Sequence, residues 1–175
     1  MPSSPRISLS PTLLPPLRFG RGTALLCLVA ALTFFVTGSG MLEGHAVYPS
    51  WRTLAAFEGF AGYHAEYGLA LLPFLPLPLL LSTIGTGWLI FRRPAGVPRS
   101  LVIAALCCQL VVLIVTAVLA IPIQAELATP GHSPDEIVAL VDRLIAISYL
   151  RELPGLAVAG GFVVMLVLAI RGRAR

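Results

Sequence analysis

The chain has 175 residues, of which 57% are hydrophobic and only 11% are charged. Soluble domains have roughly 45–50% apolar and about 25% charged residues, so this composition excludes an ordinary soluble protein and indicates an integral membrane protein. All twelve basic residues are arginine, and the formal net charge is +4. We assign this positive charge to contact with the lipid bilayer rather than with nucleic acid.

Four apolar runs are long enough to cross a bilayer, which takes about 17–25 helical residues. We therefore predict an all-α fold: an integral membrane four-helix bundle with amphipathic helices in its outer connections. Residues 1–22 are rich in Pro and Ser and are predicted to form a disordered cytoplasmic tail. Residues 23–171 are predicted to form a single four-span domain, with spans at 23–42, 67–91, 101–123 and 153–170.

The arginines predict the orientation of the bundle, because Lys and Arg are enriched in short cytoplasmic loops. Nine of the twelve lie before the first span, between the second and third spans, or after the fourth. Every acidic residue and all three histidines lie in the other two connections. We expect a multi-pass protein of the plasma or inner membrane with both termini in the cytoplasm.

The first span has to be distinguished from a cleaved signal peptide. Residues 23–36 would serve as the apolar region of a signal, and Gly44-His45-Ala46 is a tolerable cleavage site. The apolar run nevertheless continues to Leu42, and the segment before it is long for a signal peptide. We favour a retained span, although the sequence leaves both alternatives open.

The second span is preceded by aromatic residues and interrupted by prolines. A helix over residues 51–63 is predicted to lie at the membrane interface and to continue into this span, because aromatic and apolar residues recur there at helical spacing. Pro73, Pro76 and Pro78 follow inside the span. Proline removes a helical hydrogen bond, so we expect a bend or local unwinding in the outer half of the span.

This bend has two interpretations: it only shapes helix packing, or it opens a wedge that admits a small ligand from the outer side. In the second case the candidate ligand-binding residues are polar side chains near the outer ends of the spans, namely His64, Glu66, Tyr67 and Arg151. A charge at the end of a span needs water, lipid phosphate or a carboxylate. The candidate carboxylate partners of Arg151 are Glu66, Glu126 and Glu152.

The longer outer connection predicts a helix that begins at a capping box. Ser133-Pro134-Asp135-Glu136 has a capping serine, a proline at the first helical position and a glutamate at the third, and an apolar stripe follows. We expect this helix to run to Glu152. There Pro154-Gly155 either breaks the helix or kinks it into the fourth span.

Two features of the spans bear on packing. Gln109 lies nearly in the middle of the third span and is expected to form hydrogen bonds to a neighbouring helix. In the fourth span, Ala157-x-x-x-Gly161 allows close helix approach within the bundle or between subunits. A homo-oligomer or a partner membrane subunit is therefore a candidate assembly.

The sequence contains no spacing typical of a metal site. His64 and Glu66 are two residues apart and so point to different faces of a helix, and there is no His-x-x-x-His, Glu-x-x-His or Cys-x-x-Cys. Nucleotide loops and nucleophile elbows are also absent from the sequence. We predict no metal and no cofactor, and we assign no catalytic residue.

Two short motifs resemble sequence patterns of a known protein family. They are Ile121-Pro122-Ile123-Gln124-Ala125-Glu126-Leu127 at the end of the third span and Ser148-Tyr149-Leu150-Arg151 at the end of the outer helix. Together with the four short spans, they make residues 60–170 similar to small bacterial membrane proteins related to the anthrone-oxygenase-like family, many of which have no known function. The family pattern prefers Asn near Gln124 and Trp or His at Tyr149. The resemblance implies an oxygenase-like or oxidoreductase-like enzyme that acts on a lipophilic aromatic substrate.

Two function classes follow. The first is a non-catalytic bundle that binds a lipid, a small lipophilic ligand or a partner at its outer face. The second is the enzyme that the resemblance implies, with the polar residues of the outer face transferring protons. A channel or transporter is disfavoured, because the spans contain too few charged residues. Whether the chain is an enzyme is left open.

Overall fold

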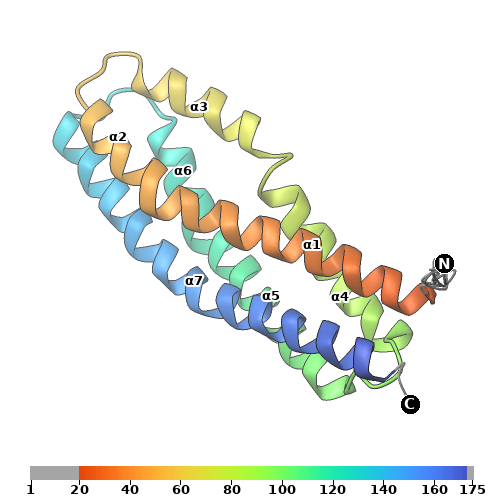
Figure 1. Ribbon diagram of the computed structural model, residues 1–175. Coiled ribbons are helices and arrows are strands. Elements are labelled where there is room, and N and C mark those ends of the chain that lie inside the picture. The colour runs from red at the N-terminus through yellow and green to blue at the C-terminus, as the bar shows by residue number, and fades with distance from the viewer. Residues whose placement is uncertain (1–19, 173–175) are drawn as a thin grey trace, which may run out of the picture.

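The computed structural model describes residues 20–172, so nearly all of the tail predicted at residues 1–22 lies outside the described residues. Within that range the secondary structure is entirely helical, and four helical rods are long and apolar enough to cross a membrane (Figure 1). The predicted all-α four-helix bundle is confirmed. The rods are Arg21–Leu54, Phe60–Arg92, Arg99–Leu127 and Pro134–Arg171.

Three of the rods are built from shorter segments. The first consists of α1 (Arg21–Leu42), a π-helical turn η1 (Glu43–Val47) and α2 (Tyr48–Leu54). The second consists of α3 (Phe60–Leu71) and α4 (Pro76–Arg92). The third consists of α5 (Arg99–Val115), a π-helical turn η2 (Thr116–Ala120) and α6 (Ile121–Leu127). The fourth is the single helix α7 (Pro134–Arg171).

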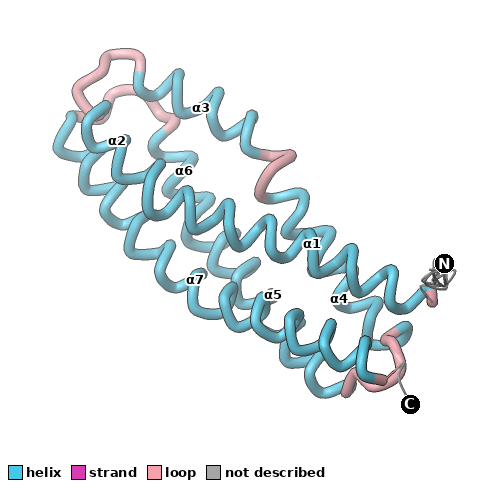
Figure 2. Tube along the Cα trace, in the orientation of Figure 1, coloured by secondary structure: helices cyan, strands magenta, loops and turns pink. Residues whose placement is uncertain are grey.

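The rods pack as a ring in which α1 and α5 each contact both α4 and α7. α3 diverges from this ring and contacts α6 (Figures 1 and 2). At the opposite end of the bundle, Gly22 packs directly on the backbone of Arg92, and Gly172 packs on the backbone of Ala95. The start of α1, the turn between α4 and α5, and the end of α7 therefore share one end of the bundle.

Prolines explain the irregular segments of the rods. The proline ring clashes with the carbonyl four residues earlier and provides no N–H, which disturbs a regular α-helix. Pro49 and Pro122 lie in the first turns of α2 and α6, directly after η1 and η2, and the wider π-helical turns accommodate them. Between α3 and α4 the helix is interrupted at residues 72–75, a segment that contains Pro73 and directly precedes Pro76. The local unwinding predicted for the second span is confirmed.

Residues 51–63 do not form the single helix that the sequence predicted. α2 ends at Leu54, and residues 55–59 form a turn before α3 begins. The first rod is already long enough to span the membrane, so the chain has to reverse here, and Gly59 is the residue that precedes α3. Trp51 therefore belongs to the first rod, whereas the aromatic residues after the turn belong to the second.

The helix predicted to begin at the capping box and the fourth span are one continuous helix, since α7 runs through Pro154 without a break. Neighbouring helices tolerate such a proline inside a membrane bundle. At the start of α7 the predicted capping box is confirmed: the Ser133 side chain accepts from the Glu136 backbone N–H, and the Glu136 carboxylate accepts from the Ser133 N–H at 2.7 Å.

Two apolar cores fill the bundle, one toward the chain termini and one around α2, α6 and the first half of α7. Along α7, the residues of the second core end at Ile147, and those of the first core begin at Val158. Along the first rod, the corresponding limits are Ala30 and Val47. The middle of the bundle therefore belongs to neither core, and the candidate site lies there.

Candidate functional site

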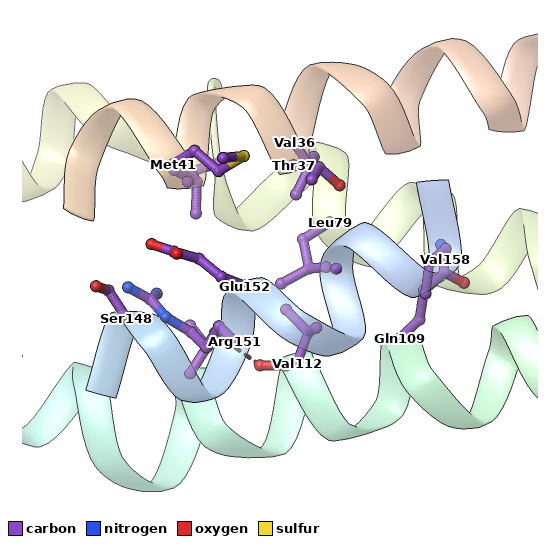
Figure 3. Close-up of a pocket in the computed structure, with 14 residues that line it drawn as sticks. Val36, Thr37, Met41, Leu79, Gln109, Val112, Ser148, Arg151, Glu152 and Val158 are labelled. Carbon is purple, nitrogen blue, oxygen red and sulfur yellow. Dashed lines mark hydrogen bonds between the residues drawn. The ribbon is translucent and has the colours of Figure 1, made fainter. Parts of the chain in front are cut away.

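A cavity lies between the two cores and is lined by all four rods; we call it the central cavity. Its volume is about 50 Å³, several times the roughly 10–15 Å³ that one water molecule needs. Figure 3 shows Ser148, Arg151 and Glu152 at one end of the cavity and Gln109 at the other. The wall between these ends is mostly apolar and includes Val36, Met41, Leu75, Leu79, Val112 and Val158.

Two glycines leave space for the central cavity between α1 and α7. Gly40 and Gly155 both line it. A Cβ atom at Gly40 would meet no atom within 4 Å, and one at Gly155 would meet only Thr37, at 3.7 Å or more. Gly44 differs, because a Cβ atom there would lie 2.7 Å from the Ser148 hydroxyl. The rods thus touch at Gly44, leave open space at Gly40, and at Gly155 leave room for a methyl group in ordinary contact with Thr37.

A buried carboxylate, that of Glu43, adjoins the Arg151 end of the cavity and is only 3% exposed. The Tyr48 hydroxyl donates to its Oε2 at 2.9 Å, and the Tyr67 hydroxyl donates to its Oε1 at 3.1 Å. The Tyr48 oxygen accepts in turn from Arg151 Nη2 at 3.3 Å and from Gln124 Nε2 at 3.4 Å. We call these five residues the Glu43 cluster. Its members come from five different helical segments, so it joins three of the rods to α7.

Arg151 belongs both to the Glu43 cluster and to the wall of the central cavity. Its Nη2 donates to Tyr48, while its buried Nε has no hydrogen-bond partner among the described residues. A guanidinium has several N–H donors in a fixed plane, so Arg151 has donors to spare where it borders the cavity. Beside it, the two carboxylate oxygens of Glu152 lie 3.0 and 3.1 Å from His45 Nε2. Arg151 is therefore placed to bind an acceptor group within the cavity.

Gln109 forms the interhelical hydrogen bonds that the sequence predicted. Its side chain is 3% exposed, and its Nε2 donates to Thr33 Oγ1 at 3.3 Å and to Ser82 Oγ at 3.4 Å. These two hydroxyls belong to α1 and α4, so Gln109 ties three rods together at the end of the cavity opposite Arg151. Its Oε1 has no hydrogen-bond partner within residues 20–172.

The four sequence-predicted ligand residues have different surroundings. Tyr67 and Arg151 meet at the Glu43 cluster. His64 is buried beside Trp51, with ring centroids 4.5 Å apart, and neither of its ring nitrogens has a partner in the described part of the chain. Glu66 is exposed. Among residues 20–172, Arg151 forms no ion pair with Glu66 or with the other two predicted carboxylates, and instead donates to Tyr48.

Glu43 is the candidate that the sequence analysis missed. The available signal was a glutamate placed directly after the apolar run that ends at Leu42, with a tyrosine five residues later. Its hydrogen-bond donor Tyr67 is 24 residues away in the chain, and no sequence spacing indicates that contact. The described residues include no group of three His, Cys, Asp or Glu side chains that could hold a metal ion.

The chain matches no protein-family model, no curated protein and no solved structure.

Proposed function

We propose that this protein binds a small lipophilic ligand inside the membrane, in the central cavity, with a polar group of the ligand at Arg151. The observation that supports this most is the position of two unpaired atoms. Arg151 Nε and Gln109 Oε1 are buried at opposite ends of one apolar cavity, and neither has a partner among the described residues. Folded proteins rarely leave buried polar atoms unpaired, so a bound molecule is expected to supply the missing contacts.

The charges around Arg151 favour an uncharged ligand. The Glu43 carboxylate lies one hydroxyl group away from the guanidinium, and Glu152 lines the cavity beside it. A carboxylate on the ligand would add a third negative charge at close range, which is unfavourable. A neutral carbonyl or ether oxygen would accept from Arg151 without that cost. The small volume of the cavity also favours a slender molecule.

We propose that the bundle lies in a bacterial plasma or inner membrane with both termini in the cytoplasm. The helix ends that meet at one end of the bundle (Figure 1) carry five arginines at or beside them: Arg21, Arg92, Arg93, Arg99 and Arg171. Such enrichment of arginine is typical of the cytoplasmic side. The Glu43 cluster then lies toward the outer surface, so that Arg151 and Glu152 form the outer end of the central cavity.

An enzyme that acts on a lipophilic aromatic substrate is the second candidate, and the Glu43 cluster favours it. A carboxylate and two tyrosine hydroxyls in hydrogen-bond contact are groups that accept and donate protons in catalysis. The Arg151 guanidinium stays charged and would stabilise negative charge that develops on a substrate. Both candidates use the same cavity. They differ in whether the bound molecule is chemically changed. A lipophilic aromatic compound can be incubated with the protein, recovered and analysed by chromatography, which would reveal such a change.

Equilibrium binding of methyl octanoate to the protein in lipid nanodiscs tests the proposed function. We expect saturable binding that weakens roughly 3- to 10-fold in Arg151→Met, because one hydrogen bond contributes about 0.5–1.5 kcal/mol. Arg52→Met is the matched control, since Arg52 is exposed and paired with Asp142. Absence of saturable binding, or equal affinity in the wild type and Arg151→Met, would contradict the proposal.

A further inference from the structure

The orientation of the Gln109 side-chain amide is determined by its neighbours. The Thr33 hydroxyl donates to the Val29 carbonyl at 2.8 Å, and the Ser82 hydroxyl donates to the Leu79 carbonyl at 2.9 Å. A hydroxyl group has a single hydrogen to donate, so toward Gln109 both oxygens act only as acceptors. They therefore select the NH₂ group of Gln109, which donates to both of them.

This arrangement leaves the amide oxygen of Gln109 without a donor. With the amide turned over, its oxygen would face two hydroxyl oxygens whose hydrogens are already used, so that orientation is unfavourable. Both amide hydrogens are also engaged, which fixes the direction of the oxygen. Gln109 lines the central cavity and is 3% exposed, so a molecule bound in the cavity is well placed to supply the partner of its oxygen. A buried acceptor is costly to leave unpaired.

The two ends of the cavity differ in their hydrogen-bonding groups. Gln109 offers an acceptor at the inner end. At the outer end Arg151 offers a donor, while the neighbouring Glu152 carboxylate faces His45. Thr33 accepts a hydrogen bond from Gln109. Met41 lies near the Arg151 end of the cavity (Figure 3) and is eight residues after Thr33 on α1. At the rise of an α-helix this separation is about 12 Å along the axis.

We infer that the ligand of the central cavity carries a hydroxyl group that donates to Gln109 Oε1 at one end, and an uncharged acceptor that binds Arg151 toward its other end. This inference rests on the proposed function and names the ligand class: a slender, neutral, lipophilic molecule with a hydroxyl at one end and a carbonyl or ether oxygen toward the other. Gln109 is then the residue that determines specificity, because it distinguishes a hydroxyl from an ether or a methyl group.

Three methyl esters that share the octanoyl chain and differ only at its far end test the inference on the full chain in nanodiscs: methyl 8-hydroxyoctanoate, methyl 8-methoxyoctanoate and methyl octanoate. We expect the hydroxy ester to bind at least five-fold more tightly than methyl octanoate, although it is the more polar of the two. The methoxy ester has no hydrogen to donate and should not show this gain. Gln109→Leu should abolish the preference for the hydroxy ester, so that this variant does not bind methyl 8-hydroxyoctanoate more tightly than methyl octanoate.

A second variant tests the orientation of the amide without removing it. Thr33→Val combined with Ser82→Ala removes both acceptors that hold the NH₂ group, so the amide becomes free to turn. The preference for the hydroxy ester should fall in this variant and the methoxy ester should gain affinity. If Gln109→Leu does not fold, this double variant still tests whether the Gln109 amide oxygen accepts from the hydroxyl group of the ester. An unchanged preference for the hydroxy ester in the double variant would contradict that contact.

The outcomes separate the inference from the proposed function. Equal affinity of the wild type for methyl 8-hydroxyoctanoate and methyl octanoate would overturn the inference while the proposed function stands. A preference for the hydroxy ester that persists in Gln109→Leu would overturn it as well. If none of the three esters binds saturably, both the proposed function and the inference are wrong.

Discussion

The Tyr48 hydroxyl donates to Oε2 of Glu43 at 2.9 Å. The Tyr48 oxygen in turn accepts from Nη2 of Arg151 at 3.3 Å. Tyr48 therefore connects a buried carboxylate of the first rod to a guanidinium that lies 103 residues later in the chain. A buried carboxylate is stable only when its oxygens are hydrogen-bonded and its charge is compensated. Glu43, Tyr48 and Arg151 should consequently stabilise the bundle as one unit.

Replacing Tyr48 by Phe should lower the free energy of unfolding by about 1–3 kcal/mol, because Glu43 Oε2 loses its donor and remains buried. Thermal unfolding in detergent measures the change. Tyr149→Phe is the matched control, since Tyr149 is 52% exposed and lies outside the Glu43 cluster. Equal losses of stability in the two variants would show that the hydroxyl of Tyr48 does not stabilise Glu43.

A double-mutant cycle should detect coupling between Tyr48 and Arg151. We expect the effects of Tyr48→Phe and Arg151→Met on unfolding to be non-additive by about 0.5–3 kcal/mol, as is usual for residues in one hydrogen-bond network. The control cycle pairs Arg151→Met with Glu66→Ala and should be additive, because Glu66 is exposed and forms no ion pair with Arg151 among the described residues. Additivity in the first cycle would mean that the contact contributes nothing to stability.

The proposed orientation predicts which end of the bundle an impermeant thiol reagent reaches in intact cells. In a background without Cys27, Cys107 and Cys108, a cysteine at the exposed position Glu58 should react, and one at the exposed position Ala95 should not. Permeabilised cells provide the control, because both positions should then react. Labelling at position 95 alone in intact cells would reverse the orientation.

Local features of the fold could be predicted from the sequence because their causes are local. The capping box needs only Ser133 and Glu136, three residues apart. The interruption between α3 and α4 follows from Pro73 and Pro76, since proline disturbs a helix in any surroundings. The hydrogen bonds of Gln109 could be predicted as a class, because an amide in an apolar span needs partners, but Thr33 and Ser82 could not be identified as those partners.

The Glu43 cluster could not be predicted, because its contacts join residues that are distant in the chain. Glu43 and Tyr67 meet only because residues 55–59 reverse the chain and bring α3 back beside the first rod. That turn contains no proline, and an aromatic pattern at helical spacing continued through it, so the periodicity predicted one helix. The central cavity is likewise a property of packing, since it depends on where the two cores end.

Filling the central cavity tests its role as a ligand site most directly. Gly40 lines the cavity, whereas Gly38, two residues earlier on α1, is exposed and does not line it. A Cβ atom at either position would meet no atom within 4 Å. A side chain can therefore begin at either position without a clash of its Cβ atom, and replacing glycine by leucine removes the helix cost of glycine, about 0.8–1 kcal/mol. The pair differs mainly in whether the new side chain occupies the cavity.

The decisive measurement is the affinity of Gly40→Leu and Gly38→Leu for methyl octanoate, with the melting temperature of each variant recorded on the same preparation. If the central cavity binds the ligand, Gly40→Leu should lose saturable binding while it remains as stable as the wild type or more so, and Gly38→Leu should bind as the wild type does. Wild-type affinity in a folded Gly40→Leu protein would contradict the assignment of the central cavity as the ligand site.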